Sequence, residues 1–206
     1  MSVSNILEIF IEEQNIEFHR FNSWKHCYKF FQEEYFAEKS NANTAALHLG
    51  FYLASWGMYR GSTFLLQKDY TIHINIVKYL KENYLNKDYS FEEINILKND
   101  IVKIYKESIP DINVTDTLVT KILLGTYACI PAYDRFFQSG LKINKKTQKL
   151  SNKSFIEINN FYNENKKTFE DFEAKLKFPK MKLLDMYFWK IGFDKAVEEK
   201  LIKEAK

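Results

Sequence analysis

Apolar residues recur at spacings of three and four along nearly the whole chain, which is the pattern of amphipathic helices. It predicts a helix capped by Ser4, an aromatic helix over about 23–39, and an apolar helix over about 44–66. Further helices are predicted over 70–84, from Ser90 to Pro110, and from 113–116 to Pro131. A short helix then ends at Ser139-Gly140, two more begin at Ser154 and Thr168, and the last lies between Pro179 and Gly192. The predicted fold class is all-α, a compact orthogonal multi-helix bundle of roughly eight to ten helices.

Two of these predicted helix starts have the sequence of a capping box. Ser90 precedes Glu93, and Ser154 precedes Glu157, by the three residues that let side chain and backbone bond reciprocally. Between the predicted helices, residues 143–153 are polar and rich in lysine. This segment is predicted to be an exposed loop or, as the less favoured alternative, a small hairpin.

The apolar helix over 44–66 carries a stripe of small residues. Its members are Ala46, Gly50, Ala54, Gly57 and Gly61. Glycine inside a helix costs about 1 kcal/mol relative to alanine, so a close approach by a neighbour is the expected compensation. Helix packing is the favoured interpretation and the wall of a site is the alternative. His48 and Arg60 interrupt the apolar run, which excludes a membrane span here.

Composition bounds the architecture. The chain has 206 residues, of which 46% are hydrophobic, with only six glycines and three prolines. We expect a single helical domain over 1–206, with two lobes meeting near 110–140 as the alternative. An acidic start without a basic leader, and Cys27 and Cys129 without a CxxC spacing, favour a cytoplasmic protein with reduced thiols. No metal or cofactor motif is present, and the oligomeric state is left open.

Positive charge gathers in the last third of the chain. The net charge is +3, but residues 142–190 hold 12 lysines against six acidic residues, which gives +6 there and −3 elsewhere. Such a segment is compatible with a surface for a phosphate backbone, so DNA is a candidate partner. A solvated helical face is the alternative interpretation.

The candidate chemistry lies in the segment from Lys121 to Asp134. Lys121 shares a helix face with apolar residues, so its amine either reaches toward water or is withdrawn from it. An amine withdrawn from water can act as a nucleophile. Pro131 disfavours a continuous helix, so the chain can reverse and place Asp134 at the start of the next helix.

The order Thr120-Lys121-Ile122-Leu123, then Pro131, then Asp134-Arg135 resembles a signature of bacterial proteins described as oxoguanine DNA glycosylase-like, which are related to the helix-hairpin-helix DNA glycosylases. The resemblance implies that Lys121 attacks the sugar C1′ and that Asp134 assists departure of the base. Residues 181–189 look like the closing helix of such proteins. The Gly-x-Gly turn of the glycosylase hairpin is absent from residues 109–114.

A second group of residues is expected to bind a nucleotide or another ligand. Its members are Trp56, Tyr59, Arg60, Tyr133 and Arg135. Aromatic rings stack on a flipped base, and arginine pairs with anions. Alternatively, Trp56 and Tyr59 belong to the core and Arg60 pairs with a carboxylate such as Asp134.

Two further functions remain open alongside base processing. One is a non-catalytic helical binding or regulatory module, such as one from a mobile or defence locus. The other is a small-molecule pocket lined by Trp56, Tyr59 and Arg60.

Overall fold

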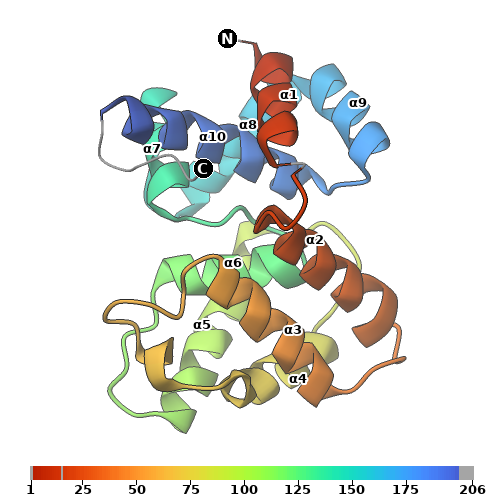
Figure 1. Cartoon of the computed structure of the whole chain (residues 1–206), viewed down its shortest axis with the longest axis vertical. Helices are drawn as coiled ribbons and strands as arrows, with labels where there is room; N and C mark the ends of the chain where they lie inside the picture. The colour runs from red at the N-terminus through yellow and green to blue at the C-terminus, as the bar shows by residue number, and fades with distance from the viewer. Residues whose placement is uncertain (1, 15, 200–206) are drawn as a thin grey trace. The chain divides into compact units, whose positions relative to one another are not determined.

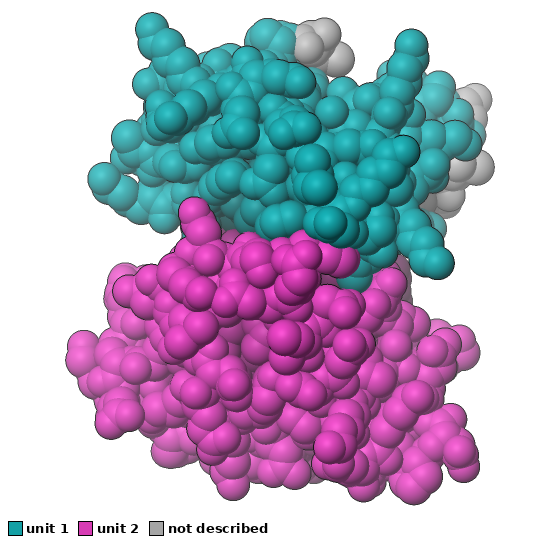
Figure 2. All heavy atoms as spheres, turned by 180° about the vertical axis from the view of Figure 1, so that it is seen from behind, with its two compact units in different colours: residues 1–16, 130–206 teal, residues 17–129 magenta. Residues whose placement is uncertain are grey.

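A computed structural model describes residues 2–14 and 16–199 of the chain, and within these residues it contains ten α-helices and no strand (Figure 1). The all-α prediction is therefore confirmed. The chain divides into two compact units, coloured separately in Figure 2. Unit 1 comprises residues 1–16 and 130–206, and unit 2 comprises residues 17–129.

Unit 2 is built around one buried helix. Its elements are α2 (Phe21–Phe30), the π-helical turn η1 (Phe31–Tyr35), α3 (Ala42–Ser55), the 3-10 turns η2 (Phe64–Gln67) and η3 (Tyr70–His73), α4 (Ile74–Glu82), α5 (Phe91–Ser108) and α6 (Asp116–Thr126). Helix α6 contacts α2, α3 and α5, and every residue from Leu118 to Thr126 is buried. Trp24 Nε1 on α2 donates to the Leu124 carbonyl at 3.1 Å, which ties α2 to this central helix.

Unit 1 is organised by its last helix. Its elements are α1 (Val3–Gln14), α7 (Arg135–Ile143), α8 (Asn152–Glu164), α9 (Lys166–Leu176) and α10 (Lys180–Glu198). Helix α10 contacts α1, α7 and α9, and it is buried from Met181 through Lys190. A helix that is buried all round in this way belongs to the core of its unit.

Glycine explains three errors in the predicted helix boundaries. The predicted helix over 44–66 ends at Ser55, because Gly57 and Gly61 adopt positive φ angles of 76° and 63°. The stripe of small residues is therefore broken, although Gly50 does pack closely against Tyr70. Helices α7 and α10 instead continue through Gly140 and Gly192, because each glycine admits the backbone of the other helix.

The boundary of α6 also differs from the prediction. The helix ends at Thr126, five residues before Pro131, and Ala128 then adopts a positive φ of 51°. The Ala128 N–H bonds to the Leu123 carbonyl at 2.8 Å and so closes the helix end. The chain therefore leaves the helix before proline is reached, and Pro131 is not what ends it.

No helix among the described residues has the length and apolar character needed to cross a membrane.

Candidate functional site

Lys121 lies at the middle of α6, on a helix whose burial is set by its apolar sequence. Thr115 caps the helix by accepting from the Leu118 N–H at 3.2 Å, and the next turn carries Lys121 into the interior of unit 2. Lys121 is only 5% exposed, so its amine is withdrawn from water, and the alternative that it reaches toward water is wrong. Its Nζ donates to the Trp56 carbonyl at 2.9 Å, which holds the amine beside the turn that follows α3.

The turn after α3 places an aromatic ring beside this amine. Trp56 is the C-terminal cap residue of α3, and Gly57 then takes the left-handed conformation. The centroid of the half-buried Trp56 ring lies 5.8 Å from Lys121 Nζ and 4.9 Å from Arg20 Cζ. Two basic side chains therefore contact one indole, whose ring quadrupole attracts positive charge.

Tyr59 is anchored to a buried histidine. Its hydroxyl is 2.6 Å from His73 Nε2, and His73 Nδ1 is 2.6 Å from the Tyr105 hydroxyl. Burial lowers the pKa of His73 to about 3, so its imidazole is neutral at pH 7. Burial, and to a lesser extent Asp69, raises the pKa of Tyr59 to about 12. Tyr59 is half-buried and held in place by this network.

Arg60 differs from its neighbour because it is exposed and forms no ion pair with any residue of unit 2 that the structure describes. Asp134 belongs to unit 1, so the expected alternative, a pairing of Arg60 with that carboxylate, stays a prediction. A Cβ added to Gly57 would lie 2.8 Å from Arg60 Nε, so the absence of a side chain at Gly57 makes room for this guanidinium. The guanidinium is accessible to an anionic ligand.

Asp134 belongs to unit 1, whereas Lys121 belongs to unit 2. As expected, Asp134 sits at the start of a helix: its Oδ1 accepts from the N–H groups of Phe136 and Phe137 at 3.0 and 3.1 Å and caps α7. Arg135 is exposed, and its Cζ lies 4.4 Å from the Phe136 ring centroid. The predicted cap is confirmed, while Arg135 stacks on a ring and forms no ion pair within the described residues.

Tyr133 lies in the core of unit 1. Its side chain is fully buried in unit 1, and its hydroxyl is 2.8 Å from the Ser154 hydroxyl. Burial raises the pKa of Tyr133 to about 12, so the phenol stays neutral. The residue joins the start of α7 to α8 and offers no ring face at the surface.

Sequence reasoning missed a buried ion pair on α10. Lys182 is 2% exposed, and its Nζ lies 2.7 Å from Asp185 Oδ2. Asp185 Oδ1 accepts from the Ala132 N–H at 3.0 Å. Burial raises the pKa of Asp185, Lys182 opposes the shift, and the charge of Asp134 adds to it. A lysine and an aspartate three residues apart in the apolar run 181–189 were the available signal.

Other chemistry is sparse within residues 2–14 and 16–199. No group of three or more His, Cys, Asp or Glu side chains is placed to hold a metal ion. Cys27 and Cys129 are both buried free thiols, and burial raises the pKa of each. An open cavity of about 520 Å³ in unit 2 is lined by η2, η3 and their surroundings, and none of its lining residues is a predicted site residue.

Comparison with known proteins adds no relative. No protein-family model matches the chain, and no curated protein or solved structure is significantly similar to it.

Proposed function

We propose that this protein processes DNA bases, with the Lys121 amine as nucleophile and the Asp134 carboxylate assisting departure of the base. The single observation that carries the proposal is the burial of Lys121 at 5% exposure on an apolar helix. A lysine amine that is held away from bulk water is the kind of group that forms a covalent imine intermediate. We infer a cytoplasmic protein, since Cys27 and Cys129 are free thiols.

The proposed reaction is a substitution at the sugar. The Lys121 nitrogen donates its lone pair to C1′ and forms a C–N bond, while the electron pair of the glycosidic bond leaves with the base, which takes up a proton. The attached nitrogen loses one proton, its lone pair then forms the C=N bond as the C1′–O4′ bond breaks, and O4′ takes a proton from water, which gives a protonated imine between the lysine and C1′. A carboxylate stabilises the positive charge that develops on the sugar, and this is the role proposed for Asp134.

The residues around Trp56 support a role in holding the nucleotide. A base turned out of a duplex is bound by stacking on aromatic side chains, and Trp56 is a half-buried indole beside the Lys121 amine. Arg60 is exposed on the same turn and can bind a phosphate. Tyr59 fixes the turn through its hydrogen bond to His73.

Borohydride trapping tests the proposal. The protein is incubated with duplexes carrying an abasic site or oxidised guanine, reduced with borohydride and analysed on a denaturing gel. We expect a covalent adduct with the wild type and none with Lys121→Gln. Lys106→Gln is the matched control, because Lys106 is an exposed lysine of unit 2. An adduct that survives in Lys121→Gln, or no adduct with any duplex, would contradict the proposal.

Asp134→Asn separates the charge of Asp134 from its structural role. Asparagine caps helices about as well as aspartate, so α7 keeps its N-terminal cap while the carboxylate is lost. We expect normal thermal unfolding together with an adduct yield reduced at least about tenfold, since a positioned charge in an active site contributes upward of 1.4 kcal/mol. An unchanged yield would remove Asp134 from the reaction.

A non-catalytic helical binding module is the second candidate. The observation in its favour is that Asp134 Oδ1 accepts from two backbone N–H groups, which is a complete structural role for that oxygen. This alternative predicts binding of DNA or another partner without any adduct on Lys121.

A further inference from the structure

A strongly basic segment of unit 1 connects α7 to α8. Residues 142–153 contain five lysines and no acidic residue. The lysines are Lys142, Lys145, Lys146, Lys149 and Lys153. Like charges gathered in twelve residues repel one another, and a polyanion relieves that repulsion.

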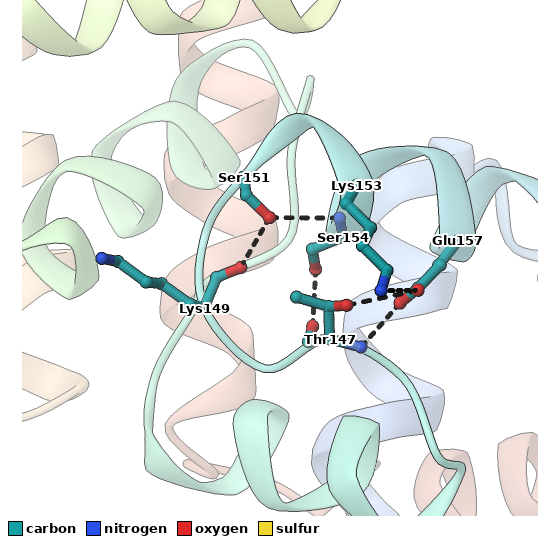
Figure 3. A network of polar contacts seen from close by, with 6 residues as sticks. All are labelled: Thr147, Lys149, Ser151, Lys153, Ser154 and Glu157. Carbon is teal, nitrogen blue, oxygen red and sulfur yellow. Dashed lines mark hydrogen bonds and ion pairs between the residues drawn. The ribbon is translucent and has the colours of Figure 1, made fainter.

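Hydrogen bonds to α8 hold this segment in place. The Thr147 N–H donates to Glu157 Oε2 at 2.6 Å, and the Thr147 hydroxyl donates to Glu157 Oε1 at 3.2 Å (Figure 3). The buried Ser154 hydroxyl donates to the Thr147 carbonyl at 2.8 Å. Ser151, rather than the predicted Ser154, caps α8 by accepting from the Ser154 N–H. The middle of the basic segment is therefore fixed to the helix that follows it.

The anchoring glutamate remains charged. The hydrogen bond from the Thr147 N–H is the main cause that lowers the pKa of Glu157. The hydrogen bond from the Thr147 hydroxyl and the charges of Lys153 and Lys146 lower this pKa further. Lys153 lies 3.9 Å from Glu157, and Lys146 lies 5.2 Å from the Phe161 ring centroid. These two lysines are thus engaged within unit 1.

The other three lysines are available to a partner. Lys142, Lys145 and Lys149 are exposed, and none of them forms an ion pair or hydrogen bond through its amine with a residue that the structure describes. In Figure 3 the Lys149 side chain extends away from the polar network around Thr147. Lys145 takes a left-handed conformation, with φ of 55°, at the point where the chain leaves α7.

We propose that Lys142, Lys145 and Lys149 form a contact surface for the phosphate backbone of DNA. The three lysines lie close together in the sequence, and the hydrogen bonds from Thr147 to Glu157 order the loop that carries Lys149, which lowers the ordering cost when a polyanion binds. The uncharged polar residues Gln148 and Asn152 are also exposed there and can bond phosphate or sugar oxygens. No aromatic residue occurs in 142–153, whereas membrane-surface segments combine lysines with such residues.

The choice of DNA rests on the proposed function, and the test keeps the two apart. Binding of a short, undamaged, labelled duplex is measured by fluorescence anisotropy over a series of salt concentrations, in a Lys121→Gln background that cannot form an adduct. The slope of log affinity against log salt falls by about 0.9 for every phosphate contact removed. We therefore expect the triple variant Lys142→Gln/Lys145→Gln/Lys149→Gln to lower the slope by about 2.7, which corresponds to about 40-fold over a fourfold change in salt.

A control of equal charge decides whether position matters. Lys68→Gln/Lys78→Gln/Lys106→Gln removes three exposed lysines of unit 2 and changes the net charge equally. We expect this control to change the slope by less than 1, with both triple variants unfolding at the wild-type temperature. Equal losses in the two triple variants would overturn the proposal. Binding to anionic vesicles without binding to DNA would also overturn it.

The outcomes for binding and for chemistry can be told apart. Loss of DNA binding in the 142–149 triple variant, with no borohydride adduct in the wild type, would support the phosphate surface and reject the catalytic role of Lys121. An adduct on Lys121 with unchanged binding by the triple variant would support the catalytic role of Lys121 and reject the phosphate surface.

Discussion

Gly140 and Gly192 meet where α7 crosses α10 in unit 1, and a Cβ added to Gly192 would lie 2.9 Å from the backbone nitrogen of Gly140. The same Cβ would overlap the Phe136 carbonyl oxygen, and a Cβ on Gly140 would overlap the Phe188 carbonyl oxygen. Backbone atoms cannot rotate away as a flexible side chain can. The crossing therefore depends on glycine at both positions.

We expect Gly192→Ala to lower the free energy of unfolding by about 3 kcal/mol, because the added methyl group forces the two helix backbones apart. Urea unfolding followed by circular dichroism measures this change. Ser139→Ala, a neighbour of Gly140 on α7, is the control and should change stability by less than about 0.5 kcal/mol. Wild-type stability of Gly192→Ala would show that the crossing tolerates a side chain.

The same sequence pattern has two different structural outcomes in this protein. Ser90 and Glu93 form the predicted capping box, with both reciprocal hydrogen bonds present. Ser154 and Glu157 have the same spacing, but both side chains bond to Thr147 and Ser151 caps the helix. Local signals decided the first case. In the second case, hydrogen bonds to Thr147 in the preceding loop replace the capping box, and the four residues of the Ser154–Glu157 pattern do not reveal these bonds.

The candidate site shows the same limit. The helix spacing around Lys121 left exposure and burial as open alternatives, because the pattern of one helix does not say which neighbours cover it. Burial by the surrounding elements of unit 2 decided this. Gly57 was assigned to a helical stripe, but its φ of 76° makes it the turn that carries Trp56. Asp185 was missed because its partner Lys182 made the pair resemble an ordinary solvated helix position.

We expect Asp185→Ala to destabilise the protein by about 3–5 kcal/mol, because it leaves the buried Lys182 ammonium without its carboxylate. The double variant Lys182→Met/Asp185→Asn removes both charges and keeps an acceptor for the Ala132 N–H. It should be more stable than Asp185→Ala, and the difference is measured by urea unfolding. If the double variant is the less stable of the two, the unpaired Lys182 ammonium is not the cause of the loss in Asp185→Ala.

His73 makes stability depend on pH. The pKa of His73 is lowered to about 3 in the folded state, against about 6.5 when unfolded, so the unfolded chain binds the extra proton between these values. The neutral His73 therefore contributes its full share of the free energy of unfolding above about pH 6.5, and this share is lost as the pH falls toward the folded-state pKa. At pH 5 the loss amounts to about 2 kcal/mol. We expect urea unfolding between pH 5 and pH 8 to show this decrease, and His73→Gln to remove it.

His48 provides the comparison for that measurement. Burial, followed by the charge of His26, lowers the pKa of His48, but the residue is only partly buried. His48→Gln should therefore remove a smaller part of the pH dependence than His73→Gln does. Equal effects of the two variants would show that burial of His73 is not the main cause.

Stability separates a catalytic Lys121 from a structural one. A buried ammonium loses its hydration, and replacing a buried ion with an apolar side chain of similar volume is often neutral or stabilising. We therefore expect Lys121→Met to unfold within about 1 kcal/mol of the wild type, or at higher denaturant, while it forms no borohydride adduct. Lys121→Arg should likewise form no adduct, since a guanidinium stays protonated. If Lys121→Met instead loses more than about 2 kcal/mol, the hydrogen bond to the Trp56 carbonyl stabilises unit 2, and the amine is retained for folding.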